Sequence, residues 1–301
     1  MGRLIAIYLA GSAPRQFVIR KQKKEIVMRK QTTVLLLGIL FAWTLSSLAQ
    51  NLVENGNAED GERNWTGIKT LPDASKTGGN CFELTGQSAF ASEFIPVDVT
   101  KKYKISGCVK NTGKEPCDFF LALAPFDKYK RPIKVEQIHI IYDSETVLAE
   151  ACSAEDKILK VKDGSKWKSG GNLFLAAFDV DDSGAYADLP NCTLTAGKVS
   201  SLQNNNGIWE VTLSGVCGKK FPAGTKVREH CYGDVYIYPV IIKGLKTGDG
   251  WKDFSGQVHD MAKFGAVGEQ FWPGTAFVKI GVLRISGSRI LFDDISFERM
   301  D

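Results

Sequence analysis

Beyond residue 50, hydrophobic positions recur in short runs rather than at helical spacing. These runs are rich in Val, Ile, Phe and Tyr, and clusters of Gly, Asn, Asp, Pro and Ser separate them. Alternation of apolar and polar residues over short segments is typical of antiparallel strands. No stretch keeps the 3.6-residue period of an amphipathic helix. The pattern therefore predicts an all-β chain, either a sandwich or a barrel.

The predicted strands fall into two groups that flank a different middle region. They cover residues 52–57, 81–85, 89–97, 103–110, 117–126, 133–141, 234–242, 251–258, 277–285 and 289–297. The last of them contains the adjacent carboxylates Asp293 and Asp294. Since paired carboxylates in an apolar strand are costly to bury alone, we expect a cation or several backbone donors beside them.

The middle region, residues 143–231, differs from both flanks. A short strand and turn is predicted at 157–164, and further strands at 173–178 and 208–213. No flexible linker separates this region from its neighbours, so it is interpreted as an inserted β segment within one sandwich spanning 50–301. Elaborated loops of the same sandwich are the alternative.

Residues 1–49 have the composition of a targeting segment. Arg29 and Lys30 precede an apolar run at 32–45, and small residues lead up to Ala49. This order predicts a secretory signal peptide cleaved near Ala49, and so an extracellular or periplasmic protein. The run is shorter than the roughly 20 residues of a membrane span, so no span is expected in the mature chain. Residues 1–27 lack this pattern, which favours Met28 over Met1 as the start.

Removing the leader changes the charge of the protein. The whole chain has 38 Lys and Arg against 34 Asp and Glu, and the leader holds eight of the basic residues and one acidic residue. The mature part therefore has 30 basic and 33 acidic residues, a net charge of −3 with His neutral. This balance gives no electrostatic reason to expect nucleic acid as a partner.

All seven cysteines lie beyond the leader, as expected in an oxidising compartment. A turn centred on residues 111–114 would place Cys108 opposite Cys117 on antiparallel strands, so a disulfide between them is predicted. Cys81 is then left free. The sequence has no CxxC or paired-His spacing to support a zinc site. The other four could pair among themselves: Cys152, Cys192, Cys217 and Cys231.

Several motifs of the two flanks carry a family resemblance. They are Asn51-Leu-Val-Glu-Asn-Gly-Asn-Ala-Glu followed by Trp65, Gly79-Asn-Cys-Phe-Glu-Leu-Thr-Gly, Tyr103-Lys-Ile-Ser-Gly-Cys-Val-Lys, Trp251-Lys-Asp-Phe-Ser-Gly and Leu291-Phe-Asp-Asp-Ile-Ser-Phe-Glu. In this order they resemble carbohydrate-binding modules of families four, nine and twenty-two. The resemblance implies a galactose-binding-like jelly-roll β-sandwich whose first and last strands are neighbours. It does not extend to the insertion.

The resemblance also implies a structural calcium ion. Its ligands would be Glu59, Asp293 or Asp294, and backbone carbonyls around Gly79. Calcium takes about 6–8 oxygen ligands, so such a site would neutralise the carboxylate pair and join the two chain ends. The pair Asn57-Ala58 departs from the family, which usually has a larger apolar residue before the acid. As an alternative, the aspartates cap turns or pair with Arg284 and Arg289.

A glycan-binding function requires aromatic faces, because the C–H groups of a pyranose ring stack on them while polar groups bind its hydroxyls. The candidates are Trp272 in a Pro-Gly loop, Tyr236 and Tyr238 on one predicted strand, Tyr129 and Trp65. For each of them, packing in the core or at its rim is the alternative. The preferred interpretation is a secreted, non-catalytic protein that binds a poly- or oligosaccharide.

Two other classes of function stay open. One is an adhesion or structural protein of the cell surface or an extracellular assembly, with the sandwich as scaffold. The other is a polysaccharide lyase or hydrolase, for which His139, His230, His259 and the many carboxylates are the candidate acid–base groups. The sequence contains no serine elbow and no HExxH motif, so the enzyme class is disfavoured.

Overall fold

The computed structural model describes residues 50–181, 184–287 and 289–300. Residues 51–301 form one compact unit, and the predicted signal peptide lies outside the described residues. Within the described residues, the helical structure is one short 3₁₀ helix, Val135–Gln137. The described residues contain no helix that is long and apolar enough to cross a membrane. The all-β prediction is confirmed.

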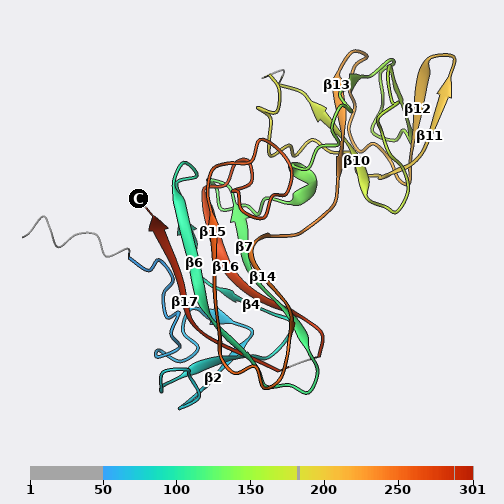
Figure 1. The fold of residues 1–301 in the computed structure, drawn as a ribbon. Helices are drawn as coiled ribbons and strands as arrows, with labels where there is room; N and C mark the ends of the chain where they lie inside the picture. The colour runs from blue at the N-terminus through green and yellow to red at the C-terminus, as the bar shows by residue number, and fades with distance from the viewer. Residues whose placement is uncertain (1–49, 182–183, 288, 301) are drawn as a thin grey trace, which may run out of the picture. The chain divides into compact units, whose positions relative to one another are not determined.

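Two antiparallel sheets form the body of the unit (Figure 1). The five-stranded sheet has the order β15-β6-β17-β3-β2. Its strands are β2 (Ile68–Leu71), β3 (Cys81–Leu84), β6 (Lys102–Asn111), β15 (Lys252–Val258) and β17 (Ile290–Met300). The six-stranded sheet has the order β1-β4-β16-β7-β14, with β5 also paired to β16. Its strands are β1 (Trp65–Thr66), β4 (Ser88–Ala91), β5 (Ile95–Pro96), β7 (Cys117–Phe126), β14 (Ile237–Leu245) and β16 (Phe277–Ile285).

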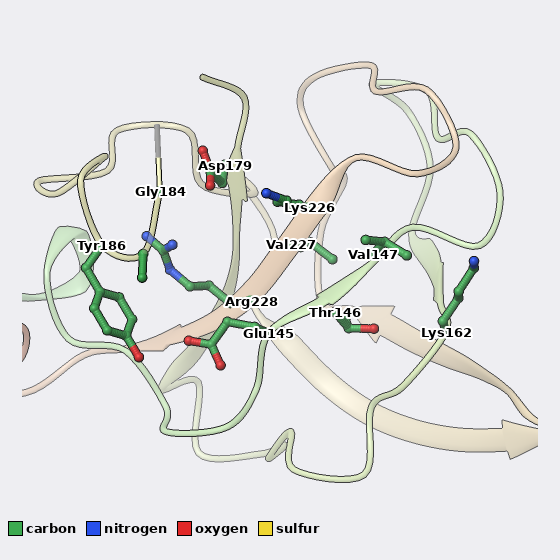
Figure 2. Close-up of a pocket in the computed structure, with 11 residues that line it drawn as sticks. Glu145, Thr146, Val147, Lys162, Asp179, Gly184, Tyr186, Lys226, Val227 and Arg228 are labelled. Atoms are coloured by element: carbon green, nitrogen blue, oxygen red, sulfur yellow. The ribbon is translucent and has the colours of Figure 1, made fainter. Parts of the chain in front are cut away.

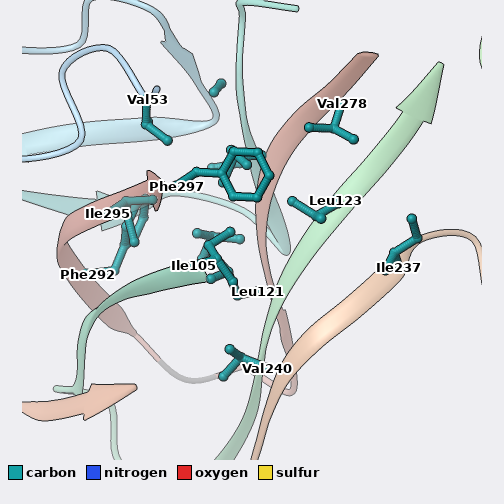
Figure 3. Packing of buried hydrophobic residues seen from close by; sticks show 14 of the residues in the cluster. Val53, Ile105, Leu121, Leu123, Ile237, Val240, Val278, Phe292, Ile295 and Phe297 are labelled. Atoms are coloured by element: carbon teal, nitrogen blue, oxygen red, sulfur yellow. The ribbon is translucent and has the colours of Figure 1, made fainter. Parts of the chain in front are cut away.

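The chain crosses between the two sheets as it advances. From β3 it passes to β4 in the other sheet, returns to β6, and crosses again to β7; β14, β15, β16 and β17 alternate in the same way. This winding is that of a jelly roll. One hydrophobic cluster between the sheets takes side chains from both, including Ile105, Phe292 and Phe297 from one and Leu121 and Val278 from the other (Figure 3). The predicted jelly-roll β-sandwich is confirmed.

The first residues of the described unit lie against its last strand. The Leu52 amide donates to the carbonyl oxygen of Phe297 at 2.8 Å, and the Ile295 amide donates to that of Gly56 at 2.9 Å. A Cβ at Gly56 would lie only 2.0 Å from the Ile295 oxygen, so this approach needs glycine. The predicted contact between the two ends is confirmed. The strand predicted at 52–57 is wrong, because only an isolated bridge at Asn51 precedes a series of turns.

Two small sheets lie between β7 and β14. One has the order β10-β13-β8 and the other β11-β12-β9. Their strands are β8 (Thr146–Val147), β9 (Ile158–Val161), β10 (Phe174–Asp179), β11 (Val199–Asn205), β12 (Ile208–Leu213) and β13 (Lys226–Cys231). They share a second hydrophobic cluster, in which Phe178 and Phe221 stack with ring centroids 3.9 Å apart. The segment interpreted as an insertion therefore has a small core of its own.

The predicted disulfide between Cys108 and Cys117 is wrong. Strands β6 and β7 belong to different sheets, and Cys108 lies opposite Asp253 and Asp293 while Cys117 lies opposite Leu245. The turn between them is not a hairpin, because it leaves one sheet for the other. Both thiols are free in the part of the chain that the structure describes. The strand predicted at 133–141 is also wrong, since this segment contains the 3₁₀ helix.

Candidate functional site

The outward face of the six-stranded sheet carries a band of aromatic side chains. On β7, Phe119, Leu121 and Leu123 belong to the core cluster, so the alternate positions face outward. The same alternation on β16 places Val278, Ile280 and Val282 in the core. The outward positions on these two strands include Phe120, Ala122, Ala124, Phe126, Phe277, Lys279, Gly281 and Leu283.

The centre of this face is built from the smallest residues. Gly281 on β16 lies between Ala122 on β7 and Phe90 on β4. A Cβ at Gly281 would lie 2.3 Å from the ring of Phe90, so this ring rests directly on the β16 backbone. Ala122 is fully buried although it is on the outward face. Gly281 and Ala122 thus form a floor that aromatic rings cover.

The rings continue across the sheet from this floor. The ring centroids of Phe90 and Tyr236 are 5.3 Å apart, and those of Tyr236 and Tyr238 are 6.1 Å apart at nearly a right angle. Tyr238 in turn lies 5.5 Å from Phe120. All four rings are half-buried, so each keeps part of its surface in solvent. We call these four residues and the two floor residues the aromatic band.

Burial raises the pKa of the Tyr238 hydroxyl to about 12, with a smaller contribution from the charge of Asp234. The hydroxyl therefore stays protonated at neutral pH and can donate a hydrogen bond. The band thus combines apolar ring surface with a polar donor.

A second group of rings lies on the same face and carries cations. Phe94 packs edge-on against Phe126 and Phe277, with centroids 4.9 Å and 6.3 Å away. The Lys279 ammonium lies 4.3 Å from the centroid of Phe94, and the Lys130 ammonium lies 5.0 Å from it. Such cation–π contacts hold the two ammonium groups beside the rings, where they can donate to a bound molecule.

Two of the predicted aromatic residues lie on the aromatic band and three do not. Tyr236 and Tyr238 are in it, as described above. Tyr129 is 66% exposed, and the cations of Lys128 and Arg131 lie over its ring, 5.0 Å from the centroid in each case. Tyr129 lines a separate cavity of about 350 Å³.

The predictions for Trp272 and Trp65 are wrong, because both rings are buried. Trp272 is 0% exposed and Trp65 is 5% exposed. The turn after Trp272 is closed by Thr275, whose amide and hydroxyl donate to the Trp272 carbonyl at 3.1 Å and 2.7 Å, and the indole belongs to the core. Trp65 packs against the rings of Phe82 and Phe292. A buried ring offers no face to a glycan.

Sequence reasoning missed most of the rings on this face. These are Phe90, Phe94, Phe120, Phe126 and Phe277. The alternation of residues within β7 and β16 could have indicated these rings, because it separates the positions on each strand into two sets that lie on opposite faces of the sheet. It does not say which set faces the core when both contain phenylalanine.

Of the predicted calcium ligands, Asp293 is buried and Asp294 is exposed. Asp293 is 2% exposed and accepts a hydrogen bond from the Asp294 amide at 2.8 Å. Burial raises the pKa of Asp293 to about 7, and the charges of Asp294 and Glu59 add to this effect. Asp294 has a φ of 52° at a register shift of β17, and the shift places the two neighbouring side chains in different surroundings.

Glu59 lies over the loop before β3. Its carboxylate accepts from the Asn80 amide at 2.9 Å, and a Cβ at Gly79 would lie 2.7 Å from the same oxygen. Gly79 has a φ of 133° and therefore allows the close approach. The Gly79 carbonyl already accepts from the amides of Ala74 and Ser75, at 3.1 Å and 3.2 Å. Both lone pairs of this oxygen are used, so it does not fit the role of a metal ligand.

The fit of this region to calcium is therefore partial. In the described residues, no group of three or more His, Cys, Asp or Glu side chains is placed to hold a metal ion. Glu59 and Asp293 are nonetheless close enough for the charge of Glu59 to raise the pKa of Asp293. Arg289, considered above as a partner of the aspartates, instead donates to Glu83 at 2.9 Å. The burial of the Asp293 carboxylate, beside the carboxylates of Asp294 and Glu59, is the feature that favours a cation.

A cavity of about 590 Å³ lies in the inserted segment, lined by residues of β8, β10 and β13 (Figure 2). The Arg228 guanidinium at its wall donates to both carboxylate oxygens of Asp188, at 2.7 Å and 2.8 Å. It also donates to Nε2 of His230 at 2.9 Å, and Nδ1 of His230 is 2.9 Å from the Glu136 carbonyl. Burial and, to a smaller extent, the charge of Arg228 together lower the pKa of His230 to about 4. Both nitrogens of this neutral imidazole are engaged, so His230 is placed as a structural residue rather than as a base.

Comparisons with known proteins gave matches among solved structures only. No protein-family model matches the chain, and no curated protein matches it in sequence. One similar structure is the xylan-binding CBM22-1 domain of Xyn10C from Paenibacillus barcinonensis, with 10% identity and a TM-score of 0.36 over 84% of this chain and 97% of that one. Another is TmCBM61 in complex with β-1,4-galactotriose, with 11% identity and a TM-score of 0.33 over 84% of this chain and 100% of that one.

A third similar structure contains an enzyme domain. It is the enzymatically active domain of tailspike protein 4 from bacteriophage CBA120, with 9% identity and a TM-score of 0.30 over 83% of this chain and 21% of that one. The chain itself is an all-β jelly-roll sandwich.

Proposed function

We propose that the protein binds a poly- or oligosaccharide without catalysis, on the outward face of the six-stranded sheet. One observation carries the proposal. Half-buried rings from β4, β7 and the start of β14 form a continuous series over the small residues Gly281 and Ala122. The solvent-facing side of an antiparallel sheet is commonly polar, so a series of aromatic rings on that side favours a ligand-binding role.

The chemistry of the face suits a sugar ring. Partly exposed aromatic rings bind the C–H face of a pyranose and release water from both surfaces. The hydroxyls of the sugar then need donors and acceptors at the edge of the rings. The Tyr238 hydroxyl and the ammonium groups of Lys279 and Lys130 supply donors.

The test is binding of the mature chain, from residue 50, to a panel of soluble and insoluble polysaccharides. We expect Tyr236→Ala and Phe90→Ala each to weaken binding about fivefold or more, since stacking of a sugar on one aromatic ring is worth on the order of 1 kcal/mol or more. Tyr142→Ala is the matched control, because Tyr142 is a 67% exposed tyrosine outside the band. Equal affinity in all three variants, with unchanged melting temperatures, contradicts the proposal.

The non-catalytic part of the proposal is supported by two of the three candidate histidines. His230 is neutral and fully engaged, as shown above, and His259 is paired with Asp260 at 2.9 Å. The corresponding measurement is release of reducing or unsaturated sugar ends from every polysaccharide that binds. Release that persists through purification, and is lost with a carboxylate substitution in this chain, would assign the protein to the enzymes instead.

We further propose that Glu59 and Asp293 hold a structural calcium ion, and that the protein is exported through its N-terminal segment. When bound, the ion would supply positive charge to the buried Asp293 carboxylate. This would favour the ionised form at neutral pH and link the start of the mature chain to β17.

A further inference from the structure

Two of the cysteines in the inserted segment lie in contact. The Sγ atoms of Cys152 and Cys217 are 3.8 Å apart, and both side chains are buried, at 7% and 1% exposure. They belong to the hydrophobic cluster of the insertion, together with Leu159, Val211 and Phe221. Among the sulfur atoms of the described residues, this is the pair that the structure brings together.

The backbone around the two residues is already aligned. The Cys152 amide donates to the Phe221 carbonyl and the Phe221 amide to the Cys152 carbonyl, each at 3.0 Å. The amides of Cys217 and Gly218 donate to the carbonyls of Asp156 and Ala154, both at 2.7 Å. These four hydrogen bonds hold the segments 152–156 and 217–221 side by side. A bond of about 2.05 Å between the sulfurs then needs only a small rotation of the side chains.

We infer that Cys152 and Cys217 form a disulfide that closes the inserted segment. Of the four cysteines in the middle region that the sequence left free to pair, the other two lie in different surroundings. Cys192 is exposed and its sulfur accepts from Gln137 Nε2 at 3.3 Å. Cys231 is buried on β13, opposite Phe174.

The oxidation is a thiol–disulfide exchange with a small or protein disulfide as oxidant. The thiolate of one cysteine attacks a sulfur of the oxidant, which forms a mixed disulfide and releases one thiolate. The thiolate of the other cysteine attacks the bound sulfur, forms the Cys152–Cys217 bond and releases the second thiolate. Two electrons and two protons pass from the cysteines to the oxidant, which leaves as two thiols.

This exchange takes place before the insertion has folded. Burial raises the pKa of Cys152 to about 11, and the nearby Cys217 adds to the effect, so few thiolates form in the folded protein. The same burial then protects the finished bond from reductants. The bond closes a loop that contains β9, β10, β11 and β12. It therefore restricts the unfolded state of most of the insertion.

The experiment is disulfide mapping of the mature chain. The protein is taken from an oxidising compartment and, separately, refolded in a buffer of oxidised and reduced glutathione. Trypsin cleaves after Lys134, Lys157, Lys198 and Lys219, so Cys152 and Cys217 fall in different peptides, 135–157 and 199–219. We expect these two peptides to be linked before reduction. Of the seven cysteines, five should then react with an alkylating agent in denaturant, and all seven after reduction.

The matched control is Cys231→Ala, which removes another buried cysteine of the same segment and should leave the linked peptides in place. Cys152→Ala should abolish them and lower the melting temperature by roughly 10 °C, given the length of the closed loop. Because that variant could also lose stability through lost packing, the wild type is unfolded and refolded in reductant and then melted, and the same drop is expected. Seven free thiols in both preparations, or a link between other cysteines, overturns the inference.

Discussion

The buried carboxylate of Asp293 makes a testable link between pH, calcium and stability. Its pKa is about 7 in the folded protein, compared with 3.8 for an unperturbed aspartate. Folding therefore favours the protonated form. Asp293 therefore does not reduce the free energy of unfolding below pH 3.8, where it is protonated in both states. It reduces that free energy progressively as the pH rises towards 7. Above that value the loss is complete.

The size of the effect follows from the shift. One pKa unit corresponds to about 1.4 kcal/mol, so the change from 3.8 to about 7 is worth about 4 kcal/mol at most. Solvent reaches the exposed Asp294 and screens its share of the repulsion. We therefore expect a loss of about 2 to 4 kcal/mol between pH 4 and pH 8 in the absence of divalent ions.

The assay is denaturant unfolding from pH 4 to pH 8 with a chelator, for the wild type and Asp293→Asn. Asparagine keeps the oxygen that accepts from the Asp294 amide at 2.8 Å but carries no charge. The variant should be more stable than the wild type at pH 8 by about 2 kcal/mol or more, and this difference between the two proteins should disappear as the pH falls towards 4. Asp253→Asn is the control, because it removes a carboxylate that is 71% exposed and paired with Lys76.

Adding calcium distinguishes an Asp293 that binds a metal ion from an Asp293 that is buried without one. If Glu59 and Asp293 bind calcium, millimolar Ca²⁺ stabilises the wild type at pH 8 and leaves Asp293→Asn unchanged. No shift of the wild type in calcium removes the metal proposal but leaves the pH effect intact. A pH dependence that is the same in the wild type and in Asp293→Asn refutes the reasoning about the carboxylate itself.

Three further substitutions test other parts of the structure. Gly281→Val places a side chain where the Phe90 ring lies, because the new Cβ would be 2.3 Å from that ring. Glycan binding should be lost, and the free energy of unfolding should fall by about 1–3 kcal/mol. Unchanged binding in a pull-down would show that Gly281 does not position the Phe90 ring. Trp272→Ala should lower the free energy of unfolding by about 3–5 kcal/mol, because the indole is fully buried. A loss of glycan binding with unchanged stability would contradict the assignment of Trp272 to the core. Asp188→Asn removes the carboxylate that pairs with the buried Arg228 guanidinium, so the free energy of unfolding should fall by about 3–5 kcal/mol in denaturant unfolding. A fall below about 1 kcal/mol would mean that solvent or another group compensates for the lost carboxylate.

Local pattern predicted many of the elements of the sandwich. The segments 117–126, 208–213 and 277–285 were placed with the bounds that β7, β12 and β16 have in the structure. Each is a run in which apolar residues alternate or dominate between polar breaks, so the strand can be recognised without its partners. The segment 133–141 has similar residues but contains the short 3₁₀ helix Val135–Gln137, so the local pattern did not determine its conformation.

Pairing between strands could not be predicted in this way. The residues around 111–114 favour a turn, and a turn between two strands suggests a hairpin. The amides of Thr112 and Gly113 instead donate to the Arg289 carbonyl, at 2.8 Å and 3.1 Å, and the chain then crosses to the other sheet. For this reason Cys108 and Cys117 lie in different sheets, whereas Cys152 and Cys217, far apart in the sequence, lie in contact.

The sequence by itself determined that the chain forms strands and where many of them run, because these properties depend on residue type and local spacing. That the two ends meet was implied by the family resemblance of the motifs at 51–59 and 291–298. The tertiary structure alone decided which face of each strand is covered. On β7 and β16 both faces carry large apolar residues, and only the position of the second sheet leaves Phe120 half-buried outside while Phe119 lies in the core. Burial depends on what packs against a side chain, and the chain brings those partners from distant positions.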